Sequence, residues 1–362
     1  MMLSAGNGFI MQSDKYSRYN AGQSLKKYIL LKKGELAYNH GASKAKQFGC
    51  CYELLEDEAL IPYVYHCFKV DKNEYTPYVA FLLNNPKIDR QLKRLVSSSA
   101  RMDGLLNISF KDYMSINLSL PPYAEQKQVS DFIKRIDERI VIQEQLISSL
   151  KKYKRGVIQH IFRSHAKTDE KSKWTYVRLG DIFKKVSRRN SNGEIKNVIT
   201  NSAEYGLIPQ RDFFDKDIAV DGNTTNYYVI EYGDFVYNPR KSRTAPYGPC
   251  NRYTLRDKGI ISPLYTCLVL QSDINPSYLA WYFKSDAWYR YIYDNGSQGV
   301  RHDRVSMTDD LLMSIPVILP NKKRQQKIAD MLDMIESKLH MVQQEYEFLL
   351  QIKDGCMQQL FI

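Results

Sequence analysis

The chain has 362 residues, a length that allows two to three domains, and its hydrophobic fraction of 43% is enough for folded cores. Its net charge of +12 and its 27 tyrosines suit a surface that meets nucleic acid, although many cytosolic proteins carry a similar charge. No apolar stretch is long enough to span a membrane, the N-terminus lacks a secretory pattern, and the six cysteines show no zinc or disulfide spacing. We therefore expect a cytoplasmic protein with reduced thiols.

Residues 1–119 predict a mixed α/β domain. Residues 26–39 are typical of two strands about a turn, and residues 60–70 of a further strand, because they are rich in β-branched and aromatic side chains. Residues 76–96 predict one or two helices, broken at Pro86. The sequence then becomes polar before the next element.

Residues 120–163 predict one long helix. Two prolines stand at its start, where a missing backbone N–H is tolerated. Apolar residues then recur at alternating steps of four and three, an average of 3.5, which is the spacing of a coiled-coil seam. The predicted seam residues are Val129, Ile133, Ile136, Ile140, Ile147 and Leu150.

Residues 164–173 are polar and charged without periodicity, and predict a linker. Residues 174–318 predict a second α/β domain, which opens with WTYVRLGDIF, a segment typical of a buried tryptophan, a strand and a helix start. The first domain has no counterpart of this opening. Two interpretations remain open: the chain is a truncated or rearranged gene product, or the segment is dispensable.

Residues 319–362 repeat the long helix of residues 120–163 at a constant shift of 199 without a gap. The seam residues of this copy are Ile328, Leu332, Ile335, Leu339, Val342 and Leu349. Both seams hold a lysine in the same slot, Lys154 and Lys353, and a polar seam residue can fix the register of paired helices. We expect the two helices to pair with each other. The alternative is two unrelated amphipathic helices on separate cores.

The two domains also repeat, at shifts of 198 to 200 residues. The shift carries Gly34 onto Gly233, and Tyr38-Asn39 onto Tyr237-Asn238. The chain is therefore built as domain, helix, domain, helix, with two domains that share a scaffold and differ in most surface residues.

Catalytic motifs are missing from the sequence. LPPY at 120–123 resembles the Asn/Asp-Pro-Pro-Tyr motif of adenine aminomethyltransferases, but Leu120 cannot accept a hydrogen bond from a base. No glycine-rich nucleotide loop or metal-binding helix motif is present, and the six histidines are scattered. We predict a protein that is not an enzyme, with no metal and no cofactor of its own.

Polar loops at matching positions of the two domains are the predicted DNA contacts. Arg can bind guanine, Asn and Gln can bind adenine, and Ser or Lys can bind phosphate. For each single residue an ordinary solvated loop is the alternative. The predicted contact residues are Asn39, Lys44, Lys46, Ser98, Ser99, Arg101, Asn238, Arg240, Lys241, Arg243, Tyr247, Ser297, Gln298, Arg301 and His302.

The order of these motifs over essentially the whole chain resembles the specificity subunit of type I restriction–modification enzymes. The motifs are LPPYAEQKQVSDFI, GVIQHIF, WTYVRLGDIF and LPNKKRQQKIADML. The resemblance implies two α/β target recognition domains, each reading one half of a bipartite double-stranded DNA site. It also implies that the long helices form an antiparallel coiled coil that spaces them.

The resemblance further implies two copies of an adenine methyltransferase subunit and an ATP-dependent restriction/translocase subunit as partners. S-adenosylmethionine, ATP and Mg are expected in those partner subunits and none in this chain. The shortened first domain departs from the family pattern and puts recognition by that domain in question. Three alternatives remain: a methyltransferase or nuclease acting alone, a non-catalytic coiled-coil scaffold without a DNA role, and an inactive or recombination-donor fragment.

Overall fold

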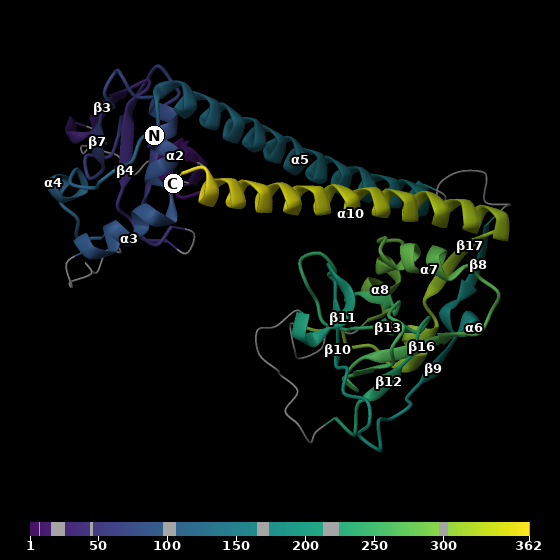
Figure 1. Ribbon diagram of the computed structural model, residues 1–362. Helices are drawn as coiled ribbons and strands as arrows, with labels where there is room; N and C mark the ends of the chain where they lie inside the picture. The colour runs from purple at the N-terminus through teal and green to yellow at the C-terminus, as the bar shows by residue number, and fades with distance from the viewer. Residues whose placement is uncertain are drawn as a thin grey trace. The chain divides into compact units, whose positions relative to one another are not determined.

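The computed structural model describes residues 1–6, 8–15, 26–43, 46–96, 106–164, 174–212, 224–296 and 303–361. The chain forms two compact units, and each contains parts of both long helices. Unit 1 comprises Met1–Gln145 and Gln343–Ile362, and unit 2 comprises Leu146–Val342. The predicted mixed α/β class is confirmed (Figure 1).

The α/β part of unit 1 contains short antiparallel strands. They are β1 (Met2–Ser4), β2 (Gly8–Ile10), β3 (Ile29–Lys32), β4 (Leu36–Asn39), β5 (Cys50–Glu53), β6 (Glu58–Ile61) and β7 (His66–Phe68). Its helices are α1 (Gln12–Lys15), α2 (Thr76–Leu83), α3 (Pro86–Leu95) and α4 (Phe110–Tyr113). The strands form a sheet of order β5-β4-β7 and the pairs β3-β6 and β1-β2. Helix α2 packs on β5, and the core between them holds Leu36, Tyr38 and Val79.

One predicted strand of this domain needs correction, and the predicted helix break is observed. Residues 60–70 are two strands rather than one, because the chain turns after β6 and Tyr65 donates its N–H to the carbonyl of Pro62 at 3.1 Å. Pro62 itself has no N–H to give to a ladder. The prediction of one or two helices broken at Pro86 is confirmed: α2 ends at Leu83 and Pro86 begins α3, where the Asn85 side chain accepts the N–H of Lys87.

The α/β part of unit 2 repeats this plan with additional elements. Its strands are β8 (Trp174–Arg178), β9 (Phe183–Val186), β10 (Ile199–Ser202), β11 (Gly206–Pro209), β12 (Tyr228–Ile230), β13 (Phe235–Tyr237), β14 (Cys250–Arg252), β15 (Gly259–Ile261), β16 (Thr266–Leu270) and β17 (Pro316–Pro320). Its helices are α6 (Leu179–Ile182), the 3-10 helix η3 (Gln210–Asp212), α7 (Pro276–Phe283), α8 (Tyr289–Asn295) and α9 (Asp309–Met313). The main sheet has the order β14-β13-β16-β9.

Strand register supports the repeat. In unit 1, Leu36 lies opposite Phe68, and in unit 2 the corresponding Phe235 lies opposite Leu268. The two sheets differ because the opening of the second domain adds strands. Strand β9 pairs with β16 in the main sheet, and β8 pairs with β17. Trp174 in β8 is 7% exposed, as predicted.

The two long helices are α5 (Tyr123–Ser164) and α10 (Lys322–Gln359) (Figure 1). Helix α5 ends one residue later than predicted, and residues 319–320 belong to β17 rather than to the second helix. All twelve predicted seam residues are buried or half-buried, whereas Met334 on another face of α10 is 70% exposed. Within the part of the chain that the structure describes, no helix is long and apolar enough to cross a membrane.

Each long helix starts with a buried glutamine that holds a domain helix. In unit 1, Gln126 accepts the N–H of Tyr75 at 2.9 Å and donates to the Pro121 carbonyl at 2.8 Å. Tyr75 immediately precedes α2, so the contact fixes α2 against the start of α5.

The same clamp recurs in unit 2. Gln325 accepts the N–H of Asn275 at 3.0 Å and donates to the Pro320 carbonyl at 2.8 Å. Asn275 caps α7 through its own side chain, which accepts the N–H of Tyr278. Matching glutamines thus orient the matching helices α2 and α7.

The C-terminal end of each long helix carries a phenylalanine that packs on a domain helix. Phe361, just after α10, stacks on Tyr78 of α2 in unit 1, with ring centroids 4.9 Å apart. Phe162, in the last turn of α5, contacts Tyr278 of α7 in unit 2 at 5.6 Å. Both phenylalanines are buried, at 0% and 2% exposure. Each domain helix therefore contacts the beginning of one long helix and the end of the other.

Candidate nucleic-acid interface

Two loops of equal length, residues 39–49 and 238–248, follow the matching strands β4 and β13. Both begin with an asparagine that holds the turn. Asn39 Oδ1 accepts the N–H of Gly41 at 2.9 Å, and Asn238 Oδ1 accepts the N–H of Arg240 at 3.0 Å. We call the asparagine, the tyrosine before it and the glycine that ends each loop the loop frame.

Both loops end with a glycine that cannot carry a side chain. Gly49 has φ 84° and Gly248 has φ 83°, a region that favours glycine. A Cβ atom at Gly49 would lie 2.4 Å from the Asn39 carbonyl oxygen, and one at Gly248 would lie 2.0 Å from that of Asn238. The close approach of the two ends closes each loop.

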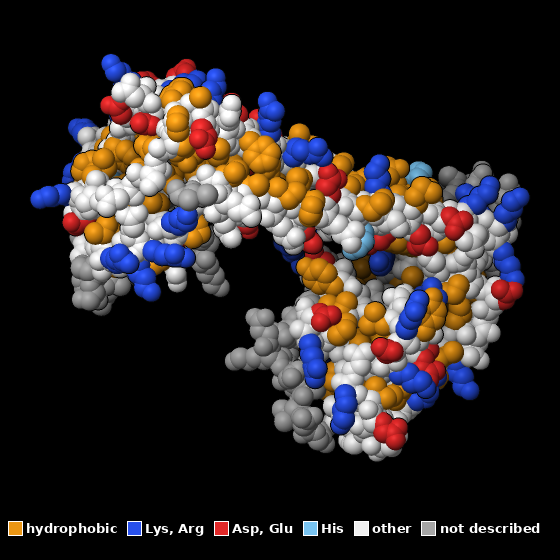
Figure 2. Space-filling view, viewed as in Figure 1, with side chains coloured by type: hydrophobic (Ala, Val, Ile, Leu, Met, Phe, Trp, Pro, Cys, Tyr) orange, Lys and Arg blue, Asp and Glu red, His pale blue; other side chains and the backbone are white. Residues whose placement is uncertain are grey.

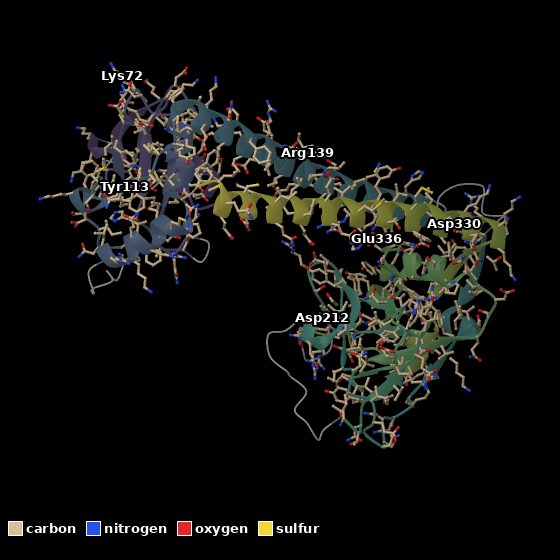
Figure 3. All side chains as sticks on the ribbon, in the orientation of Figure 1. Lys72, Tyr113, Arg139, Asp212, Asp330 and Glu336 are labelled. Atoms are coloured by element: carbon tan, nitrogen blue, oxygen red, sulfur yellow. The ribbon has the colours of Figure 1, made fainter. Side chains whose placement is uncertain are left out.

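Buried tyrosines complete the loop frame. The Tyr38 hydroxyl donates to the Phe48 carbonyl at 2.5 Å, and the Tyr237 hydroxyl donates to the Tyr247 carbonyl at 2.8 Å. Burial raises the pKa of both phenols well above the usual value, so both remain donors at neutral pH. Tyr38 also stacks on Tyr113 at a centroid distance of 3.9 Å, and Figure 3 labels Tyr113 in the first domain.

The frame changes the interpretation of three predicted contact residues. Asn238 is only 7% exposed, because its Nδ2 also donates to the Asn201 carbonyl at 3.1 Å. Asn39 is half-buried in the matching position. The Lys46 ammonium donates to the Asn84 carbonyl at 2.9 Å. These side chains support the loops, and the DNA contact predicted for Asn39, Asn238 and Lys46 stays a prediction.

Exposed cations lie on the second loop outside its frame. Arg240 and Arg243 are exposed, and no acidic partner of either lies among the residues that the structure describes. Lys241 is half-buried, and its N–H donates to the Asp303 carbonyl at 2.8 Å. The Tyr247 ring is half-buried against Tyr289, with centroids 5.1 Å apart. Arg240 and Arg243 are therefore the side chains of this loop that are free to meet a ligand.

The remaining predicted contact residues lie outside the described residues. They are Lys44, Ser98, Ser99, Arg101, Ser297, Gln298, Arg301 and His302. Their contact with DNA stays a prediction.

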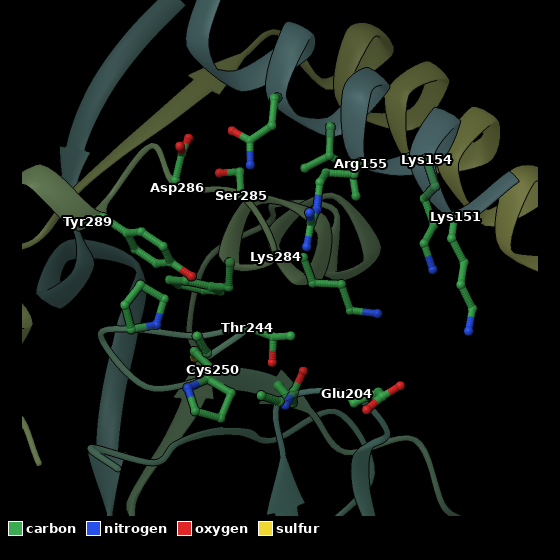
Figure 4. A pocket seen from close by; sticks show the side chains of 18 of the residues that line it. Lys151, Lys154, Arg155, Glu204, Thr244, Cys250, Lys284, Ser285, Asp286 and Tyr289 are labelled. Carbon is green, nitrogen blue, oxygen red and sulfur yellow. The ribbon is translucent and has the colours of Figure 1, made fainter. Parts of the chain in front are cut away.

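The structure adds a basic cavity that the sequence analysis missed. It lies within unit 2, has a volume of about 650 Å³, and opens between α5, the end of α7 and loop 238–248 (Figure 4). Its lining includes Lys151, Lys154, Arg155, Arg163, Lys284 and Thr244. The basic run Lys151–Arg155 could have indicated this cavity in the sequence. That the run lies against the second domain is visible only in the fold.

Acidic groups neutralise part of this cavity. The Lys154 ammonium donates to the Glu336 carboxylate at 2.5 Å, and Arg163 donates from Nε to Asp286 Oδ1 at 2.8 Å. Elsewhere on unit 2, lysine and arginine side chains are scattered over the visible face with acidic ones between them (Figure 2). Among the described residues, no group of three or more His, Cys, Asp or Glu side chains is placed to hold a metal.

The comparisons with known proteins identify the class. Residues 171–350 match the type I restriction modification DNA specificity domain. This segment is similar to that specificity domain, and the resemblance inferred from the sequence is confirmed.

Solved structures are also similar, and the one with a TM-score above 0.5 supports the fold. One, which addresses complex assembly and conformational transition of the type I R-M system, is 15% identical with a TM-score of 0.56, covering 92% of this chain and 82% of the other. The HsdS subunit from Thermoanaerobacter tengcongensis is 15% identical with a TM-score of 0.49, covering 92% and 81%. The S subunit from M. genitalium is 14% identical with a TM-score of 0.48, covering 91% and 83%.

Proposed function

We propose that this chain is the DNA sequence-specificity subunit of a type I restriction–modification complex. In this proposal residues 1–119 and 174–318 are target recognition domains, each reading one half of a bipartite site. The observation that carries it is the pair of loops 39–49 and 238–248. They share one frame of Asn, Tyr and Gly and differ in most other residues, as expected of modules that read different DNA words.

The long helices are the proposed spacer between these domains, as an antiparallel coiled coil. Ion pairs within each unit support the antiparallel direction. In unit 1, Asp137 near the start of α5 pairs with Lys353 near the end of α10 at 2.5 Å. In unit 2, Lys154 late in α5 pairs with Glu336 early in α10. A rigid helical spacer would fix the distance between two half-sites, as dimer geometry does in other DNA readers.

Catalysis belongs to partner subunits in this proposal. Two copies of an adenine methyltransferase subunit would supply S-adenosylmethionine and the catalytic motif, and an ATP-dependent restriction/translocase subunit would supply cleavage. Leu120 in place of Asn or Asp in the Pro-Pro-Tyr context supports a chain that is not itself an enzyme.

Reconstitution with the methyltransferase subunit tests the proposal. The complex is incubated with S-adenosylmethionine and a random DNA pool, and methylated adenines are mapped by sequencing. We expect methylation in one split sequence, dependent on this chain, and no methyl transfer by the chain alone. Methyl transfer by the purified chain, or methylation without sequence preference, would overturn the assignment. If the methylated sequence contains only one half-site, only one of the two domains recognises DNA.

A further inference from the structure

Three cations of the unit 2 cavity form no ion pair with any residue that the structure describes. Lys151 and Arg155 extend from α5 and Lys284 from the end of α7 toward the same opening (Figure 4). In the part of the chain that the structure describes, the ion pairs of this cavity involve Lys154 and Arg163 instead. The cavity therefore keeps more positive charge than its own acids neutralise.

Lys284 is exposed, as Lys151 and Arg155 are. Its ammonium lies 4.6 Å from the centroid of the Trp281 ring. Desolvation is the main cause that lowers its pKa, and the nearby Lys154 adds to this, against the opposing effects of Glu336 and Asp333. An anion in the cavity would offset the repulsion between Lys154 and Lys284 and favour the charged form of Lys284.

The cavity is continuous with the exposed part of loop 238–248. Thr244 lies on its wall, directly after Arg243, and the exposed Glu204 is an acidic lining residue without an ion pair among the described residues. A ligand that lies along Arg243 and enters this opening would meet Lys284 and then Lys151 and Arg155.

We propose that Lys151, Arg155 and Lys284 bind backbone phosphates of the DNA whose bases loop 238–248 reads, so that α5 is a DNA-binding element as well as a spacer. This inference rests on the proposed function. Duplex DNA presents closely spaced phosphates, and cations that neutralise them position the protein without reading sequence.

Salt dependence of DNA binding tests the inference in the complex with the methyltransferase subunit. The variants are Lys151→Gln, Arg155→Gln, Lys284→Gln and the triple combination, measured on a specific and a non-specific duplex. The slope of log K against log salt concentration is negative, and each lost phosphate contact reduces its magnitude by about 0.9. We expect the triple variant to lower it by roughly 2 to 3, with similar loss of affinity for both duplexes.

Lys152→Gln is the matched control, because Lys152 is exposed on the same helix and does not line the cavity. Thermal melting of each variant checks folding, and a variant that melts like the wild type while its slope is unchanged overturns the inference. A slope change equal to that of Lys152→Gln does the same. Loss of methyltransferase assembly with an unchanged slope would assign the cavity to a partner protein. If the wild-type complex shows no sequence preference, the proposed function fails, whereas the slope on non-specific DNA still decides the phosphate contacts.

Discussion

Lys154 of α5 donates to Glu336 of α10, and the same pair recurs 199 residues away with the helices exchanged, as Lys353 and Asp137. The lysine that stands in the same slot of both seams thus has the same kind of partner in unit 2 and in unit 1. The acidic partners correspond as well, because Asp137 shifted by 199 is Glu336. Because both pairs form only when the two helices are aligned in one register, they favour that register over shifted ones.

The first prediction concerns the strength of this pair. The Lys154 and Glu336 side chains are 21% and 43% exposed, whereas the Arg139–Glu345 pair is 65% and 44% exposed (Figure 3). Exposed ion pairs contribute about 0 to 1 kcal/mol because water screens them. A double-mutant cycle with Ala, read by chemical denaturation, should give Lys154–Glu336 about 0.5 to 1 kcal/mol and the Arg139 pair less. Equal coupling energies for the two pairs would contradict the role assigned to the seam lysine.

The second prediction concerns the glutamine clamp. Gln325→Leu removes the acceptor of the Asn275 N–H and the donor to the Pro320 carbonyl in a site where Gln325 is 4% exposed. Leaving such groups unpaired in a buried site costs about 1 to 3 kcal/mol. We expect the free energy of unfolding to fall by that amount. Gln326→Leu, at an exposed neighbour, is the control and should cost clearly less; equal costs would argue against the clamp.

Local and long-range features differ in how far the sequence predicts them. The seam residues were predictable because a 3.5-residue period is a local pattern, and their burial agrees with it. The structural role of the two loop asparagines was not predictable, because an exposed polar loop and an Asx turn look alike in sequence. What distinguishes them is the approach of Gly248 to the Asn238 carbonyl, a tertiary contact. Lys284 and Lys151 meet in one cavity only after α5 packs on the second domain.

The third prediction concerns loop closure. Gly248→Ala forces a Cβ atom toward the Asn238 carbonyl and into a φ of 83°, so the loop must open or shift. Strain of this kind costs about 1 to 3 kcal/mol. We expect lower stability of unit 2 and weaker discrimination between the specific and non-specific duplex. Gly156→Ala in α5 is the control, since its Cβ would meet nothing within 4 Å, and it should raise stability by about 0.5 to 1 kcal/mol. If folded Gly248→Ala still distinguishes the specific from the non-specific duplex as the wild type does, loop closure is not needed for DNA recognition.

The fourth prediction concerns thiol reactivity. Burial raises the pKa of Cys50 to about 11 and that of Cys267 to about 12, so both remain protonated at pH 8. The thiolate is the reactive form, and we therefore expect slow alkylation of both in the folded protein and fast alkylation after denaturation. Peptide mass spectrometry after timed iodoacetamide treatment measures this, with the half-buried Cys356 as the internal comparison. Rapid labelling of Cys267 in the native protein would show that β16 opens readily.

The fifth prediction concerns base recognition by loop 238–248. Arg240→Ala and Arg243→Ala each remove an exposed guanidinium, the group best suited to bind guanine through two hydrogen bonds. Loss of one such contact costs about 1 to 3 kcal/mol on the specific duplex. It should leave the non-specific duplex changed only by the lost charge, in contrast to the cavity variants, which weaken both duplexes alike. Arg256→Ala, at an exposed arginine outside the loop, is the control.

Methylation mapping of each variant adds a second readout, because a lost base contact relaxes the sequence at one position of the half-site read by the second domain. If both variants keep the wild-type preference and affinity, loop 238–248 does not read bases, and recognition by this domain must lie in another segment.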